Sequence, residues 1–263
     1  MKLSKKAIAG MVTIAFAVTS VTPAFAQTMP APQNEAAPQV VMMDASEMDM
    51  SVPAELVGMD RFLSKDAQGC IQLDVEAALA AGYVEQSVMG VKGHLDNINE
   101  QVLAGRLYVD STFTAYSANN QRLVPRGYLT GDREDGYTGV LTYWYGATFI
   151  YCNKKEAPLL YKSFVNTTSR CNAAIDYLSA LSDDMDMNNQ PDAQYAQNAL
   201  DCLIVGASVI GLTAYVYSTY IKNAMGNDTG IIWSIQQDFN TGTIGWAFGS
   251  QDWDAIDPDL IRP

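Results

Sequence analysis

The sequence is short of positive charge. It contains 16 Lys and Arg residues against 29 Asp and Glu residues, and its formal net charge at pH 7 is −13. A protein that binds nucleic acid or an anionic membrane surface offsets phosphate charge with cations, and this chain has few to offer. The composition therefore argues against both partners. It is compatible with a soluble secreted protein, or with one that meets cations or basic partners.

Catalytic signatures are also missing. The only histidine, His94, borders the apolar stripe of a predicted helix, where we expect an exposed side chain and not a general base. The chain has no G-x-S-x-G, H-E-x-x-H or C-x-x-C motif, so a hydrolase of the Ser-His-Asp type lacks support. An enzyme that uses two carboxylates stays open, with four tryptophans and 14 tyrosines able to stack on sugar rings. No catalytic residue is assigned.

The first 26 residues have the pattern of a secretory signal peptide. Three lysines lie within the first six residues, an apolar run spans Ala7 to Val21, and Ala24-Phe25-Ala26 matches an A-x-A cleavage site. Cleavage would leave 13 basic residues against 29 acidic ones, a net charge of −16. We therefore expect an exported protein, periplasmic or extracellular; an inner-membrane anchor is the alternative.

Composition divides the remaining chain into three parts. Residues 27–52 are rich in Pro, Ala and Met without any period, which predicts a disordered linker. Residues 53–250 are enough for a single globular domain. Residues 251–263 are acidic, and we expect them to form a C-terminal tail.

Apolar residues at helical spacing predict three main helices. The apolar positions from Val84 to Val102 recur at steps of three and four, which indicates an amphipathic helix. Residues 158–182 show the same spacing, and residues 191–226 predict one long, nearly all-apolar helix. A polar loop at residues 183–190 joins these two helices. The sequence therefore predicts an antiparallel helical hairpin.

Two other stretches favour strands. Between residues 107 and 152 Tyr, Thr, Val and Phe dominate and a polar turn interrupts them, which predicts two or three strands. Residues 230–249 contain an Asn240-Thr241-Gly242 turn and predict a β-hairpin. We therefore expect an α+β fold that is predominantly helical, with a disulfide-stapled helical hairpin as its core and small β-hairpin elements packed on it.

Four cysteines in an exported chain most simply form two disulfides. Cys171 and Cys202 are equidistant from the middle of the 183–190 loop, so the hairpin would place them at the same height. A disulfide needs Cα atoms within about 7 Å, which closely packed helices supply. We predict a Cys171–Cys202 bond and, by elimination, Cys70–Cys152. Free buried thiols are the alternative.

The uncharged stretch 202–221 has two interpretations. As a helix it would be about 30 Å long, the thickness of a bilayer core. Its serines, threonines and three tyrosines favour a helix buried in the protein core. A membrane span or a membrane-docking hairpin is the alternative, so a membrane partner stays possible through residues 202–221.

Oxygen-bearing residues alternate along the loop of the predicted hairpin, as they do in an EF-hand loop that wraps Ca²⁺. They are Asp184, Asp186, Asn188, Gln190 and Asp192. Position 6 of such a loop is Asn189 instead of Gly, and position 12 is Tyr195 instead of Glu. We therefore favour a solvated acidic turn and no cofactor, with a weak Ca²⁺ site as the alternative.

These observations favour a non-enzymatic binding or interaction module of the cell envelope or secretome, whose partner is a protein or another envelope component. Two alternatives belong to other classes. One is a carboxylate-dependent hydrolase of envelope polysaccharide, which requires a cleft with two facing carboxylates beside a tryptophan. The other is a single-span membrane-associated envelope subunit anchored through residues 202–221.

Overall fold

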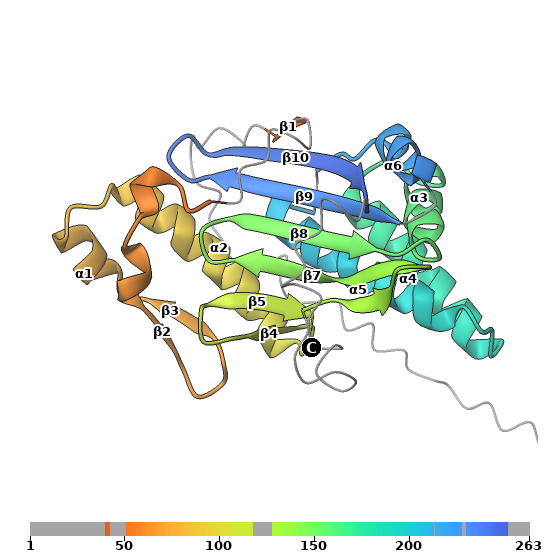
Figure 1. The fold of residues 1–263 in the computed structure, drawn as a ribbon, viewed down its shortest axis with the longest axis horizontal. Helices are drawn as coiled ribbons and strands as arrows, with labels where there is room; N and C mark the ends of the chain where they lie inside the picture. Colours follow the sequence, from red (N-terminus) through yellow and green to blue (C-terminus); the bar gives the residue numbers. More distant parts are fainter. Residues whose placement is uncertain (1–39, 43–50, 118–127, 213, 228–229, 252–263) are drawn as a thin grey trace, which may run out of the picture. The chain divides into compact units, whose positions relative to one another are not determined.

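A large β-sheet forms the centre of the fold (Figure 1). The computed structural model describes residues 40–42, 51–117, 128–212, 214–227 and 230–251. These residues all belong to one compact unit, 38–263. The predicted signal peptide, residues 1–26, lies outside the described residues.

The described strands of this sheet follow the order β1-β10-β9-β8-β7-β5-β4, and β6 pairs with β7 off this path. Their bounds are Val40–Met42 (β1), Leu107–Val109 (β4), Thr114–Ser117 (β5), Thr130–Asp132 (β6), Gly136–Tyr143 (β7), Ala147–Cys152 (β8), Ile231–Asp238 (β9) and Thr243–Ser250 (β10). Only β1 runs parallel to its neighbour among these pairs. A separate ribbon pairs β2 (Leu63–Lys65) with β3 (Ile71–Leu73).

Helices α2 and α5 lie behind the sheet in the view of Figure 1. Helix α5 contacts β7, β8 and β9, α6 contacts β9 and β10, and α2 contacts β4. The helices are Val75–Ala80 (α1), Glu85–Leu103 (α2), Ala157–Val165 (α3), Cys171–Met187 (α4), Ala193–Ile210 (α5) and Ser218–Ala224 (α6). Short 3₁₀ turns occur at Ala54–Leu56, Met59–Phe62 and Met225–Asn227.

The contact between α5 and the sheet is close because α5 carries a glycine there. A Cβ atom at Gly206 would lie 2.5 Å from Ile150 Cδ1 and 2.7 Å from Trp233 Cζ3. The Trp233 ring in turn stacks on Phe248, with centroids 5.3 Å apart. This apolar layer between α5 and the sheet is the centre of the core.

The prediction of a predominantly helical fold with a hairpin core is wrong. Helices α4 and α5 do pack as neighbours, but α5 also packs on a sheet. Strand β8 of that sheet is buried along its whole length. The described residues between 107 and 152 form five strands, where we predicted two or three. The predicted hairpin at 230–249 is confirmed as β9 and β10. It does not pack on a helical core as a separate element, because β9 pairs with β8 within the large sheet.

The single long helix predicted for residues 191–226 is also wrong. Helix α5 ends at Ile210 because Gly211 adopts a φ of 88°, which right-handed helices exclude. Before α6 begins, Tyr215 forms an isolated antiparallel β-bridge with Arg170. In the described part of the chain, no helix combines the length and apolarity that a bilayer crossing requires.

The predicted disulfides are wrong, because all four cysteines are free, buried thiols. Helix α4 continues through Met187, so the turn between the two helices is centred near residue 190. Cys171 is therefore farther from this turn along α4 than Cys202 is along α5, and the two residues do not face each other. The backbone N–H of Cys171 instead donates to the Ala214 carbonyl at 3.0 Å. The thiol of Cys202 points at the Tyr151 carbonyl, 3.8 Å away.

The environment of three of these thiols, those of Cys70, Cys171 and Cys202, favours the protonated form. Burial raises the pKa of Cys171 to about 12. The pKa of Cys202 is raised by a hydrogen bond with Cys152 and by burial. Burial also raises the pKa of Cys70, which we had predicted to pair with Cys152.

The amphipathic helix predicted from Val84 to Val102 is confirmed as α2, but its histidine does not lie at the surface. His94 is 2% exposed. Its Nε2 lies 2.8 Å from the Tyr143 carbonyl, and the Gln237 amide lies 3.4 Å from its Nδ1. Burial lowers the pKa of His94 to about 4, so the ring is neutral at pH 7.

Two described segments come from ranges that we expected outside the globular domain. Strand β1 falls within residues 27–52 and pairs with β10. Gln251 is fully buried. Its carboxamide accepts from the Tyr137 N–H at 2.7 Å and donates to the carbonyls of Tyr137, Cys152 and Ile231. Residues 252–263 lie outside the part of the chain described.

Candidate functional site

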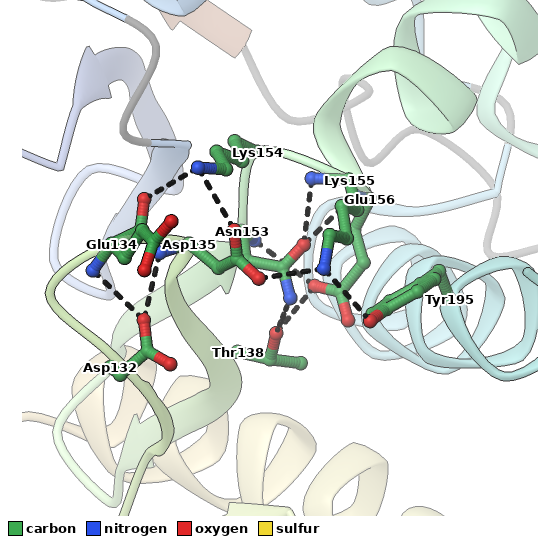
Figure 2. A network of polar contacts seen from close by, with 9 residues as sticks. All are labelled: Asp132, Glu134, Asp135, Thr138, Asn153, Lys154, Lys155, Glu156 and Tyr195. Carbon is green, nitrogen blue, oxygen red and sulfur yellow. Dashed lines mark hydrogen bonds and ion pairs between the residues drawn. The ribbon is translucent and has the colours of Figure 1, made fainter.

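The most buried acidic side chain described belongs to a capping box at the start of α3 (Figure 2). The Asn153 side chain accepts from the N–H groups of Lys155 at 2.9 Å and Glu156 at 3.0 Å. Glu156 Oε2 reaches back to the Asn153 N–H at 3.0 Å. This reciprocal pairing satisfies N–H groups that a helix start otherwise leaves without partners.

Glu156 also ties α3 to two other elements. Thr138 of β7 donates its hydroxyl to Oε2 at 2.6 Å, and Asn198 of α5 donates to Oε1 at 2.8 Å. Burial raises the pKa of this carboxyl, and the hydrogen bonds from Thr138, Asn198 and the Asn153 backbone partly oppose the rise. A buried carboxyl with a raised pKa is a feature shared by catalytic acids and structural networks.

Two lysines of the same turn form ion pairs at the surface. Lys154 and Lys155 lie 2.9 and 2.7 Å from the two oxygens of Asp135, and Lys155 also contacts the Tyr195 hydroxyl at 3.2 Å (Figure 2). The hydrogen bond from Lys155 is the main cause that lowers the pKa of Asp135. These contacts fasten the β6–β7 turn to the start of α3.

The space beside Glu156 is too small for a substrate. Thr138 and Asn198 line a cavity of about 40 Å³, together with Arg106, Asp201 and Cys202. Ligand sites occupy roughly 300–1,000 Å³, whereas a cavity of this size holds only water molecules. Three donors already occupy the oxygens of Glu156. The network therefore serves to hold α3, α5 and β7 together.

A larger hollow, which we call the Trp144 groove, lies at the other end of β8. Its volume is about 400 Å³. It is lined by Val52, Val57, Gly58, Asp60, Ser111, Thr112, Phe113 and Trp144. Loops held at one end of a rigid sheet are common places for binding sites.

Two turns supply the aromatic wall of the groove. The pairing of Thr114 with Tyr143 puts the β4–β5 and β7–β8 turns at the same end of the sheet. In the first turn the Asp110 carboxylate accepts from the N–H groups of Thr112 and Thr114 and holds Phe113 at a φ of 62°. A bulky residue with a positive φ is strained, and such strain is concentrated at functional sites.

The third wall comes from the segment before α1. Gly58 adopts a φ of 82°, which allows the chain to turn between the two 3₁₀ turns. The Tyr83 hydroxyl fixes this bend by donating to the Val57 carbonyl at 2.8 Å. The Val57 side chain is 64% exposed, and the Asp60 carboxylate has no partner among the described residues. The groove thus combines apolar walls with one unpaired negative charge.

The residues of the predicted calcium loop are not arranged as an EF-hand loop. Asp184 and Asp186 lie in α4, where side chains two residues apart point to opposite sides. Asn188 caps that helix and donates to the Asp184 carbonyl, Gln190 lies in the connection, and Asp192 precedes α5. In the described ranges, no three His, Cys, Asp or Glu side chains gather closely enough to hold a metal ion.

Sequence reasoning missed both sites for different reasons. The capping box has a readable signal, Asn153-Lys154-Lys155-Glu156, which places Asn and Glu at the required spacing before an apolar run. The Trp144 groove has none, because its walls come from three segments that are far apart in the sequence and meet only in the folded protein.

No protein-family model, curated protein or solved structure matches the chain.

Proposed function

We propose that the protein is a non-enzymatic binding module of the cell envelope or secretome, and that the Trp144 groove holds its ligand. The observation that carries this proposal is a hollow of about 400 Å³ with Trp144 and Phe113 in its wall and the unpaired Asp60 carboxylate at its side. This volume and this mixture of apolar walls with one charged group are typical of ligand sites.

The same features define the ligand. The apolar walls favour a ligand with an apolar body, and Asp60 favours a cationic group next to it. The net charge of −13 also favours a cation. A segment of protein in which a lysine lies between apolar residues meets these requirements.

The hydrolase alternative has weaker support. It requires two facing carboxylates beside a tryptophan, and the described lining of the groove contains a single one, Asp60. Glu156, the buried carboxyl with a raised pKa, lies at the opposite end of β8 beside a 40 Å³ cavity. The binding function therefore fits the geometry better.

Calorimetric titration with two blocked tripeptides, Leu-Lys-Leu and Leu-Glu-Leu, tests the proposal. We expect Leu-Lys-Leu to bind and Leu-Glu-Leu to bind at least tenfold more weakly. Asp60→Asn is expected to weaken Leu-Lys-Leu binding by about tenfold, because it removes one charge-assisted contact. Val57→Ser is expected to weaken the binding of both peptides through lost apolar area.

Asp186→Asn and Met187→Ser are matched controls at the end of α4, where Met187 is 76% exposed. Both controls are expected to bind as the wild type does. Equal heats for the two peptides, or Leu-Lys-Leu binding that survives Asp60→Asn, would refute the proposed ligand class. No heat at millimolar peptide would refute the groove as the binding site.

A further inference from the structure

Two of the longer acid-free segments of this chain are neighbours in the structure. Residues 157–175 and 202–227 carry neither Asp nor Glu, although the chain has 29 acidic residues. The same two segments carry three cations, Lys162, Arg170 and Lys222. The two segments therefore carry a net positive charge in a chain that is negative overall.

The structure places these segments side by side. The Cys171 N–H donates to the Ala214 carbonyl at 3.0 Å, and the Val216 N–H donates to the Ser169 carbonyl at 2.8 Å. Arg170 donates to the Tyr215 hydroxyl at 2.7 Å, and its guanidinium lies 4.6 Å from the centre of that ring. Helices α3 and α6, which carry Lys162 and Lys222, pack on one another.

Large apolar side chains are exposed on these segments. Leu212 is 49% exposed, Tyr215 46% and Tyr217 57%, and Val165 at the end of α3 is 49% exposed. We call these four residues and the three cations the Tyr217 surface. In the part of the chain that the structure describes, none of the three cations forms an ion pair.

We propose that the Tyr217 surface docks the protein on a bilayer that contains anionic phospholipid. Tyrosines suit the level of the lipid headgroups, since their rings are apolar and their hydroxyls polar. Leu212 and Val165 can enter the boundary of the acyl chains, while the three cations meet lipid phosphates. The net negative charge of the rest of the chain repels anionic lipid, so only the Tyr217 surface is expected to face the bilayer.

The absence of acid from these two segments favours a bilayer over an acidic protein as the occupant. A protein partner meets only part of such a surface, and carboxylates at its solvated rim cost little. A bilayer presents phosphate along the entire face, and every carboxylate there would be repelled. This proposal is independent of the Trp144 groove.

Co-sedimentation of the protein with lipid vesicles tests the proposal. We expect wild-type protein to pellet at low salt with vesicles of phosphatidylglycerol and phosphatidylcholine, and not with phosphatidylcholine alone. Replacing Lys162, Arg170 and Lys222 together by Gln is expected to lower the partition coefficient by roughly 100-fold. The double variant Leu212→Ser/Tyr217→Ser is expected to lose most of the binding as well.

Lys92→Gln on α2 and Leu103→Ser, whose side chain is 63% exposed, are controls of matched chemistry away from the Tyr217 surface. They are expected to pellet as the wild type does, and circular dichroism checks that each variant is folded. Controls that lose binding to the same extent would overturn the proposal. Failure of the wild type to pellet with anionic vesicles would also overturn it and leave the surface to an acidic protein.

Discussion

At the scale of single residues, His94 connects three elements through one neutral ring. It extends from α2 to the Tyr143 carbonyl of β7 and to Gln237 of β9, and its ring lies 5.8 Å from that of Phe239. Gln237 continues the contact by donating to the Val209 carbonyl of α5. Protonation of this ring would place a charge in the interior.

We predict that acid destabilises the protein through His94. The folded pKa of about 4 lies below the unfolded value of about 6.5, so the unfolded chain binds the proton first. The stability from His94 is fully present above pH 6.5 and is lost as the pH falls toward 4, by about 3 kcal/mol. Urea unfolding at several pH values measures this loss. His94→Gln keeps a donor for Tyr143 and is expected to give a flatter pH profile; parallel profiles would contradict the prediction.

The burial of His94 could not be predicted from its own helix. Helical spacing correctly places it at the edge of the apolar stripe of α2, and an edge position is exposed unless another segment covers it. The cover is Phe239, which lies far along the chain in the turn of the last hairpin. Glu156 differs, because its partners in the capping box are local and its spacing from Asn153 is visible in the sequence.

At the scale of elements, the distance between α5 and the sheet depends on a single glycine. Gly206 faces Ile150 and Trp233 at separations that leave no room for a methyl group. Glycine in a helix interior costs about 1 kcal/mol relative to alanine. The tight packing that it allows offsets this cost.

We predict opposite effects of alanine at two helical glycines. Gly206→Ala is expected to destabilise the protein by about 1–2 kcal/mol, because overpacking outweighs the gain in helix propensity. Gly93→Ala in α2 is expected to stabilise it by about 0.5–1 kcal/mol, since the new methyl group would meet no described atom within 4 Å beyond its chain neighbours and the backbone of its own helix. Urea unfolding of both variants measures the difference, and stabilisation by Gly206→Ala would refute the close contact.

The spacing of apolar residues and the turn residues predicted those elements whose structure depends on residues close in the sequence. Helix α2 and the β9–β10 hairpin have clear periods and turn residues, and both are confirmed. The pairing of β8 with β9 joins segments that lie on either side of α3 to α6, and no local pattern records it. Both β8 and a buried helix read as continuous apolar runs, which explains why the sheet was taken for small elements around a helical core.

At the scale of the whole molecule, the core is held by apolar packing and not by covalent links. All four thiols are buried and free. The error in the predicted disulfides arose from the length of α4, because five more helical residues move the turn and shift which residues face each other.

We therefore predict that a reductant leaves the thermal unfolding midpoint unchanged. In urea without reductant, four thiols are expected to react with Ellman's reagent. In the native protein the reaction is expected to be slow, since all four thiols are buried. Fewer than four reactive thiols in urea would show a disulfide and contradict the prediction.

The carboxamide of Gln251 also bears on how the polypeptide reaches this state during synthesis. It completes the hydrogen bonding of Tyr137, which precedes it by 114 residues. A ribosome must therefore add all of these residues before the ends of β7, β8 and β9 can be locked to one another. Until then the ends of these three strands lack the side chain that joins them in the folded protein.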